Sequence, residues 1–382
     1  MPNTWTYTFL EEKRQIADPL ADQIVANLVE QTGQQAAKAL FDELTQNVDL
    51  PLKGKFPEVD EFLKSTAQLP EWADPPKLHL ANRFFTDHGP KLLIILYHKS
   101  LPTLYLDANG AKVLVHTGRL AHDGKSRNTF ARRVAETGQF LLNVMQQKAL
   151  TKNGVGIKAA QKIRLIHASV RNFIPEDHWN AEDWGLPINQ EDLALTLMSF
   201  SVLLLDGLDA FGIKYSEEEA EAYIHYWNVI GYFMGINEDL FPASRQEASK
   251  LVKAILDRQA YPSEEGSILA ESLVTFTEAN IPFEKFEKTS TLLIAFLIGN
   301  RYAAMLNIVP PQGCLAYFIP RIFKGVFKSG ERLEDIVNQP MKLFIETFSH
   351  VAAKKMVGYF DNYKNRHFTI PEEFEKAWFR GT

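Results

Sequence analysis

Three side chains with useful chemistry share one helical face near the middle of the sequence. His167 lies in an apolar stretch, with Arg164 three residues before it and Arg171 four residues after it. At helical spacing both arginines fall on the face of the histidine. An imidazole nitrogen binds metal ions, and guanidinium groups bind carboxylates. The pattern therefore allows an anionic ligand that carries a metal, with the arginines either holding its carboxylates or closing salt bridges within the core.

A second group of candidate residues lies upstream. Arg133 and Thr137 are four residues apart and so share a helix face, and Glu136 precedes the threonine. Each group also has a simpler explanation. A lone histidine on an apolar helix is commonly a core residue with both ring nitrogens hydrogen-bonded. Arg133 would then form an ordinary surface salt bridge with Glu136 or another acid.

The charge balance and the cysteine content exclude several classes of protein. A formal net charge of -6 with scattered basic residues indicates no nucleic-acid partner. Cys314 is the only cysteine, which excludes an intramolecular disulfide, an iron–sulfur cluster, a cysteine-based zinc site and haem attachment through two cysteines. Cys314 could ligate a metal as a thiolate, but a buried small hydrophobe is its expected role.

Motifs of several common enzyme classes are absent from the sequence. There is no Walker A motif and no nucleophile elbow. Gly154 and Gly156 fit a loose dinucleotide-binding pattern, but no strand precedes them, so we interpret them as the turn that begins the helix of His167. None of the ten histidines has a glutamate three residues before it, which disfavours the di-iron sites of helical bundles.

Helix signals dominate the sequence. Ser216 with Glu219 predicts a capping box that opens a helix ending near Gly235, and Ser244 with Glu247 predicts a second one.

The most apolar segment predicts a central helix. It begins after Asn189, runs from about Gln190 to Phe211 and ends before Gly212. Other expected elements are a helix over 127–146, a long amphipathic helix over 18–45, loops at 50–57 and 74–77 and, as the best strand candidate or else a helical turn, 112–115.

These signals favour one mainly helical domain with helical extensions at both ends. The most apolar short runs, 92–97 and 292–298, are far below the roughly 20 residues that span a bilayer, so no membrane span is predicted. The first residues lack the basic start and apolar stretch of a secretory signal. We therefore expect a cytoplasmic protein.

Two ordered motifs carry a family resemblance. The run R-L-x-H-A-x-V-R at 164–171, followed by P-I-x-Q-x-D at 187–192, resembles the core of the rubber oxygenases (latex clearing proteins) and mycophenolic-acid prenyl-cleaving oxygenases. The similarity extends from about Ser100 to Pro242, with further shared segments at 100–102, 117–120, 221–227 and 235–242.

The resemblance implies an all-α fold, namely a single large helical domain with a globin-like, haem-binding helical core. The corresponding division is an N-terminal helical extension at 1–90, a haem-binding oxygenase-like core at 91–260 and a C-terminal helical region at 261–382 that packs on the core.

The resemblance also implies haem b as the cofactor and assigns roles to residues. His167 falls on the proximal iron ligand, with Arg164 and Arg171 as candidates for holding the haem propionates. His225 is the fallback ligand, although a structural role suits it better. His116 is a weaker candidate again.

Arg133 and Thr137 fall on the segment that frames the distal side of the haem. Glu136 departs from the family, because rubber oxygenase has a lysine at this place that can cap the iron in a closed state. Glu136 either points to Arg133 or Arg132, or serves as a base, or leaves the distal site open to water. An unpaired carboxylate near haem needs a raised pKa.

The expected function is oxidative attack by dioxygen on a small apolar alkene or isoprenoid-type substrate, with C=C cleavage to carbonyl products. Two alternatives stay open. One is a haem-binding sensor or carrier without turnover, and the other is a haem-free helical scaffold of the same fold.

Overall fold

The computed structural model of the 382-residue chain describes residues 5–46, 52–116, 127–152, 154–174, 178–280, 289–310 and 371–379. Within these ranges the protein is all-α, and an isolated β-bridge joins Asp107 to Ala260. The described helices are α1 (Tyr7–Arg14), α2 (Pro19–Thr32), α3 (Gln34–Gln46), α4 (Pro57–Ser65), α5 (Pro75–Ile95), the π-helix η1 (Leu96–Ser100), α6 (Leu101–Tyr105), α7 (Ala108–His116), α8 (Arg127–Met145), α9 (Val155–Phe173), α10 (Ala181–Trp184), α11 (Gln190–Phe200), α12 (Val202–Phe211), α13 (Glu217–Phe233), the 3₁₀-helix η3 (Glu238–Leu240), α14 (Arg245–Gln259), α15 (Glu264–Asn280), α16 (Thr289–Ile298), α17 (Asn300–Met305) and α20 (Glu372–Phe379).

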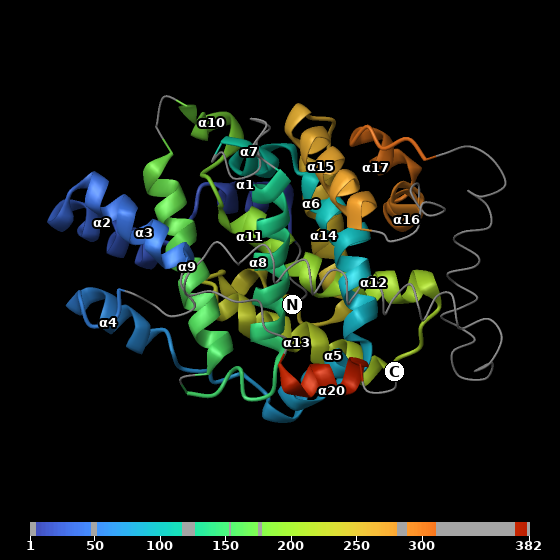
Figure 1. Cartoon of the computed structure of the whole chain (residues 1–382), viewed down its shortest axis with the longest axis horizontal. Helices are drawn as coiled ribbons and strands as arrows, with labels where there is room; N and C mark the ends of the chain where they lie inside the picture. Colours follow the sequence, from blue (N-terminus) through green and yellow to red (C-terminus); the bar gives the residue numbers. More distant parts are fainter. Residues whose placement is uncertain are drawn as a thin grey trace.

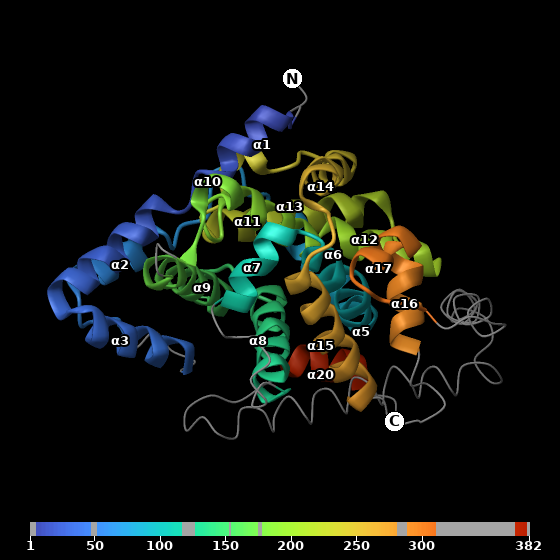
Figure 2. The same cartoon turned by 90° about the horizontal axis from the view of Figure 1, so that it is seen from above.

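The main hydrophobic core gathers around α11, α12 and α13. Leu195, Leu204 and Val229, one from each of these helices, are completely buried in it. α11 lies near the middle of the molecule, in contact with α1, α13 and α14 (Figures 1 and 2). The long helix α5 packs along α13, and α20 packs on α5. The central helices therefore have few polar faces to present to water.

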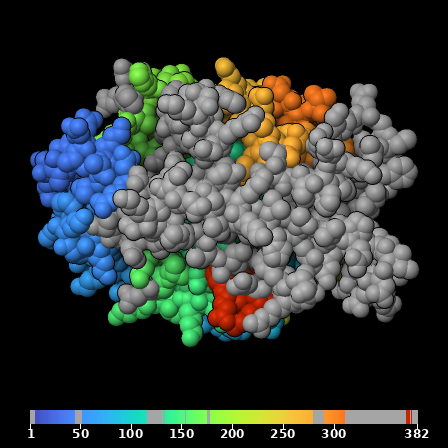
Figure 3. Space-filling model, viewed as in Figure 1, coloured from blue at the N-terminus to red at the C-terminus, as the bar shows by residue number. Residues whose placement is uncertain are grey.

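A smaller hydrophobic cluster joins the N-terminal helices to α9. Leu28 of α2 and Phe62 of α4 pack with Leu165 of α9 in this cluster. α9 also contributes Ile157 and Ala160 to the main core. Figure 2 shows α9 between the arm formed by α2 and α3 and the rest of the molecule. In the space-filling view, α2 to α4 form one flank and α15 to α17 lie on the opposite upper side (Figure 3). The helix of His167, α9, thus contributes buried residues to both hydrophobic clusters.

Several helix ends match their predicted signals. The side chain of Ser216 accepts from the N–H of Glu219 and the glutamate bonds back to the cap, so the predicted capping box is confirmed. Gly212 ends α12 in the left-handed conformation. The box at Ser244 is only half formed, because the carboxylate of Glu247 accepts from the N–H of Ala243 instead of that of Ser244.

Two predicted long helices are interrupted in the structure. The helix expected over 18–45 breaks at Gly33, which has φ +81° and separates α2 from α3. The central helix breaks at Ser201, with φ -113° and ψ -94°, so that α11 and α12 meet at a bend. The Ser201 hydroxyl donates to the carbonyl of Leu197 at 3.1 Å, a bond that commonly bends helices.

The two halves of this central helix are together apolar over 22 residues. Taken together, Gln190–Phe211 is the one stretch among the described helices that is long and apolar enough to cross a membrane, and 78% of its most apolar window is buried inside the protein. That burial is typical of the core helix of a globular protein.

Two further expectations are settled by the structure. Residues 112–115 are helical, within α7. The loop expected at 74–77 was wrong in part, because Asp74 caps α5 and Pro75 begins it, the first position where a missing N–H costs nothing. The domain division at residues 90 and 260 stays a prediction; α5 runs through Pro90, and α14 ends at Gln259.

Candidate active site

The two helices that carry the candidate residues are consecutive and pack against each other. α8 ends at Met145 and α9 begins at Val155. The connection requires a glycine before α9, since a Cβ on Gly154 would lie 2.2 Å from the carbonyl oxygen of Ala149. The prediction that this glycine opens the helix of His167 is therefore confirmed. Together with residues 146–154, which connect them, the two helices form the α8–α9 hairpin.

Arg133 and His167 lie at equal distances along their helices from the connection between them. Each residue lies twelve positions from the connection, because α8 ends at Met145 and α9 starts at Val155. At the rise of an α-helix, twelve positions correspond to roughly 18 Å. The predicted distal and proximal residues therefore lie on consecutive helices that pack against each other.

The candidate residues occupy half-buried faces of these helices. Arg133, Glu136, Thr137 and Phe140 follow the i, i+3, i+4, i+7 pattern of one face, and all four are half-buried. The opposite side of α8 is buried in the core. On α9, Ile163, His167 and Val170 form a similar half-buried face. Both faces are therefore partly covered by other residues and partly exposed to solvent.

The polar atoms on α8 have defined surroundings. The hydroxyl of Thr137 donates to the carbonyl oxygen of Arg133 at 3.0 Å. Burial raises the pKa of Tyr105, and the positive charge of Arg133 opposes that rise, so the guanidinium lies close enough to act on the phenol of α6. The described ion pairs do not include one between Arg133 and Glu136.

Both arginines that flank His167 form ion pairs with α2. Arg164 binds the carboxylate of Asp18 through two nitrogens, with Nη2 to Oδ1 at 2.9 Å. Arg171 donates from Nε to Asp22 at 2.7 Å and from Nη1 to the carbonyl of Ile188 at 3.2 Å. These contacts match the salt-bridge alternative from the sequence. The role of the two arginines toward haem propionates stays a prediction.

The residues of the P-I-x-Q-x-D motif also form hydrogen bonds to the N-terminal segment. The side chain of Gln190 donates to the carbonyls of Ala17 and Gly235, at 2.6 and 3.0 Å, and accepts from the N–H of Asn237. Ile188 adopts φ +54°, an unusual conformation for a β-branched residue. This strained turn is held on one side by Arg171 and on the other by backbone bonds to residues 14–16.

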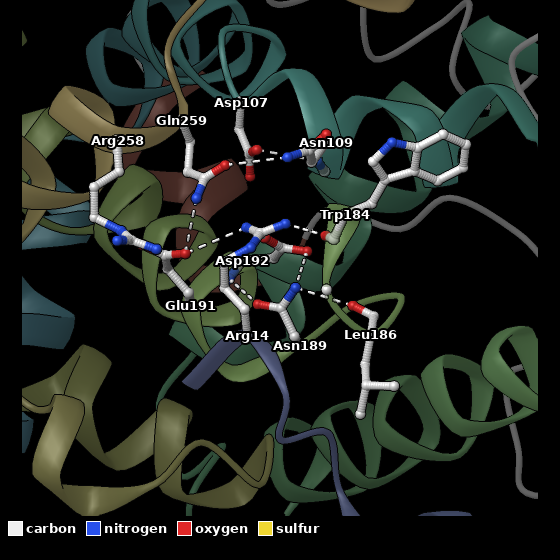
Figure 4. A network of polar contacts seen from close by, with 12 residues as sticks. Arg14, Asp107, Asn109, Trp184, Leu186, Asn189, Glu191, Asp192, Arg258 and Gln259 are labelled. Carbon is white, nitrogen blue, oxygen red and sulfur yellow. Dashed lines mark hydrogen bonds and ion pairs between the residues drawn. The ribbon is translucent and has the colours of Figure 1, made fainter. Parts of the chain in front are cut away.

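A buried network of charges surrounds Arg14 (Figure 4). Arg14 is 2% exposed and donates to Glu191 at 3.2 Å and to the carbonyl of Trp184. The other oxygen of Glu191 accepts from Arg258 at 2.9 Å. Burial by itself would lower the pKa of Arg14, but the nearby carboxylates of Asp192, Asp107 and Glu191 raise it overall. The guanidinium is therefore a permanent cation at the centre of this network.

Two carboxyl groups in this network share a hydrogen bond. Burial raises the pKa of Asp192 well above its usual range, and the charge of Asp107 adds to the rise. Burial also raises the pKa of Asp107, while bonds from Gly110, Asn109 and Asp192 counteract it. Of this pair, Asp192 has the pKa that is raised further, so it keeps a proton to higher pH than Asp107 does.

Two other histidines, His225 and His98, have structural roles. Nε2 of His225 accepts from the N–H of Asp74 at 2.9 Å. His98 is buried, with its nitrogens bonded to Ile94 and Ser290. The side chain of His116, residues 117–120 and Cys314 lie outside the described part. Across the described ranges, no group of three His, Cys, Asp or Glu side chains is placed to hold a metal ion.

A catalytic-domain profile decides the family. The profile of the ER-bound oxygenase mpaB/B'/Rubber oxygenase catalytic domain matches residues 89–325. The chain belongs to this family. The match contains the α8–α9 hairpin, the P-I-x-Q-x-D turn and the whole of α13, so the resemblance predicted from the motifs is confirmed.

Two relatives of this oxygenase family give the comparison more detail. A rubber oxygenase of Streptomyces sp. (strain K30) is 27% identical over 263 residues, which cover 67% of this chain and 62% of that enzyme. The chain thus matches less than two thirds of the rubber oxygenase. The solved structure of latex clearing protein LCP in the closed state aligns with a TM-score of 0.73 and 21% identity, over 89% of this chain and 91% of the other. The fold is a single all-α domain, as predicted.

The sequence reading missed the partners of the family motifs. Arg14, Asp18, Asp22, Asp107 and Arg258 all complete bonds to motif residues. The one signal for them was indirect, because buried acids and arginines in a motif require oppositely charged partners somewhere in the chain. Nothing in the sequence said where.

Proposed function

We propose that the protein is a haem b-dependent oxygenase that attacks a small apolar alkene or isoprenoid-type substrate, with His167 as the iron ligand. The support is the position of His167: it lies in the family-matched region, on a half-buried face of α9, and α8, which carries Arg133, packs against that helix. C=C cleavage to carbonyl products and a cytoplasmic location are parts of the same proposal.

The residues around His167 suit haem in their chemistry. Imidazole is a common axial ligand of haem iron. The neighbours of His167 on its own face, Ile163 and Val170, are apolar, as the ring plane of haem requires. Arg164 and Arg171 are occupied by Asp18 and Asp22, so any contact they make with propionates would be additional to these pairs.

The chain's own residues would supply binding and orientation. Haem b, when bound, supplies the activation of dioxygen. Arg133 and Thr137 would border the opposite side of the cofactor, where the hydroxyl proton of Thr137 is held by the carbonyl of its own helix. Phe140 extends the same face, and its ring centroid lies 6.4 Å from that of Phe200. The ring of Phe200 in turn stacks on Trp227, with centroids 5.0 Å apart. These rings favour an apolar substrate and exclude water.

The test is an absorption spectrum with a pyridine haemochrome assay on the wild type and on His167→Ala. We expect roughly one haem b per chain in the wild type and loss of that haem in the variant. His79→Ala, which removes an exposed histidine of α5, is the matched control and should keep its haem. Circular dichroism should show unchanged helix content in both variants.

The outcomes separate the alternatives. Full haem retention in His167→Ala would mean that another residue holds the iron. A haem protein that consumes no oxygen with any isoprenoid alkene would be a sensor or carrier. A colourless wild type after haem-sufficient expression would leave the scaffold function.

A further inference from the structure

A cavity of about 400 Å³ lies away from the α8–α9 hairpin. It is bordered by the start of α5, the middle of α13 and the segment that follows η3. Its volume is in the range of small-molecule sites. The proposed oxygenase function makes no use of it.

One wall of this cavity contains a buried acceptor without a partner. Asn228 of α13 is 7% exposed, and its side-chain nitrogen donates to the carbonyl of Pro242 at 2.8 Å. A carbonyl only accepts, so this bond fixes which end of the amide faces Pro242. The amide oxygen of Asn228 has no hydrogen-bond partner in the structure. Buried carbonyl oxygens are nearly always bonded, so this atom indicates a missing donor.

The charges that line the cavity are mostly negative. Asp74, Glu221 and Glu238 contribute three carboxylates against the single ammonium of Lys77. Each carboxylate uses one oxygen in a bond: to the N–H of Lys77, to the N–H of Arg245 and to the indole of Trp72, respectively. The second oxygen of each forms no described bond. These oxygens are acceptors, like that of Asn228.

The uncharged side chains of the cavity, His225 and Trp72, also suit a cationic ligand. Nε2 of His225 is committed to the N–H of Asp74. Burial lowers the pKa of His225, with the charge of Lys77 adding to the effect, so the imidazole is neutral at neutral pH. Trp72 lies beside it, with ring centroids 5.7 Å apart. Aromatic faces attract organic cations.

We propose that this cavity is a binding site for a small organic cation with several N–H donors, of the alkyl diamine or guanidino class. An ammonium or guanidinium group would donate to Asn228 and pair with Glu221 and Glu238, while the aliphatic part would lie against Trp72. Three carboxylates disfavour an anion. A metal ion is disfavoured because the described acids and histidines nowhere converge in the set of three that a metal needs.

The test is calorimetric titration of the full chain with 1,4-diaminobutane, with 1,4-butanediol as the uncharged probe. We expect the diamine to bind and the diol to give no heat. Glu221→Gln with Glu238→Gln should weaken binding at least about tenfold. Glu217→Gln with Glu218→Gln removes the same charge from exposed positions of α13 and should change binding less than about twofold.

Two further measurements test the proposal. Lys77→Met removes the competing ammonium of an exposed residue and should strengthen diamine binding. Helix content from circular dichroism and melting temperature, measured on each variant, report whether it is folded. The proposal fails if the wild type does not bind the diamine, if acetate binds instead, or if the control pair weakens binding as much as the cavity pair.

Discussion

The hydroxyl of Thr137 can be tested apart from the stability of its helix. Its one described bond goes to the carbonyl of Arg133 in the same helix, which contributes little to stability. Thr137→Val should therefore change the free energy of unfolding by less than about 1 kcal/mol. Because the proposed function places this hydroxyl beside the reacting atoms, oxygen consumption should fall by about tenfold or more.

A matched control exists on another helix. Thr86 of α5 is half-buried and donates to the carbonyl of Asn82 in the same geometry, at 2.9 Å. Thr86→Val should leave oxygen consumption and the haem spectrum unchanged. Equal activity in both valine variants would place Thr137 away from the reaction.

The raised pKa of Asp192 predicts a pH dependence of stability. A carboxyl whose pKa is raised by folding loses stability as the pH rises from its unfolded pKa of about 4 toward the folded value. Asparagine imitates the protonated form, since its oxygen can accept from Asn189 and its amide can donate to Asp107. Asp192→Asn should thus gain stability relative to the wild type from pH 5 to pH 8.

Urea denaturation at both pH values measures this difference. Asp257→Asn, at an exposed position of α14, should show no comparable gain. Asp192→Leu removes one polar partner each from Arg14, Asn189 and Asp107 in the buried network and should cost about 3 kcal/mol or more. If the advantage of Asp192→Asn instead grew as the pH fell, Asp192 would be ionised in the folded protein.

At the scale of elements, α9 is held from both sides. Its buried residues belong to two hydrophobic clusters, and its two arginines bind the first turn of α2. The end of α13 must approach this junction closely. Gly235 has φ +77°, and a Cβ there would lie 2.5 Å from Nε of Arg164 and 2.7 Å from the carboxylate of Asp18. The fit of α13 against the α2–α9 junction therefore depends on a glycine.

Gly235→Ala should displace the Arg164–Asp18 pair and destabilise the protein by about 3 kcal/mol. Limited proteolysis should then cut the N-terminal helices faster than in the wild type. Gly54→Ala is a matched control, because Gly54 has the same φ of +77° with nothing within 4 Å of the added Cβ. Backbone strain alone should cost about 1 kcal/mol there. Equal losses in the two variants would show that the contact at Gly235 contributes nothing.

At the scale of the whole molecule, local sequence signals predicted where helices begin and end. They did not predict which distant residues would form ion pairs with one another. Ser216, Asn189 and Gly212 marked helix ends correctly, because a cap is completed by residues three or four positions away. The bend at Ser201 was missed, because a serine within an apolar run does not by itself show whether its hydroxyl will bond to the carbonyl four residues earlier. The site could be assigned to helices, but the ion partner of Arg164 lies 146 positions earlier in the chain.

This separation has a consequence for the order of synthesis. Arg14 leaves the ribosome 177 residues before Glu191, the acid that neutralises it in the core. At usual elongation rates this is a delay of about 9 to 35 s. During that time the first helices carry charges whose burial sites do not yet exist. The segment around Arg14 must therefore remain in water, or on a chaperone, until the residues around Glu191 have been made.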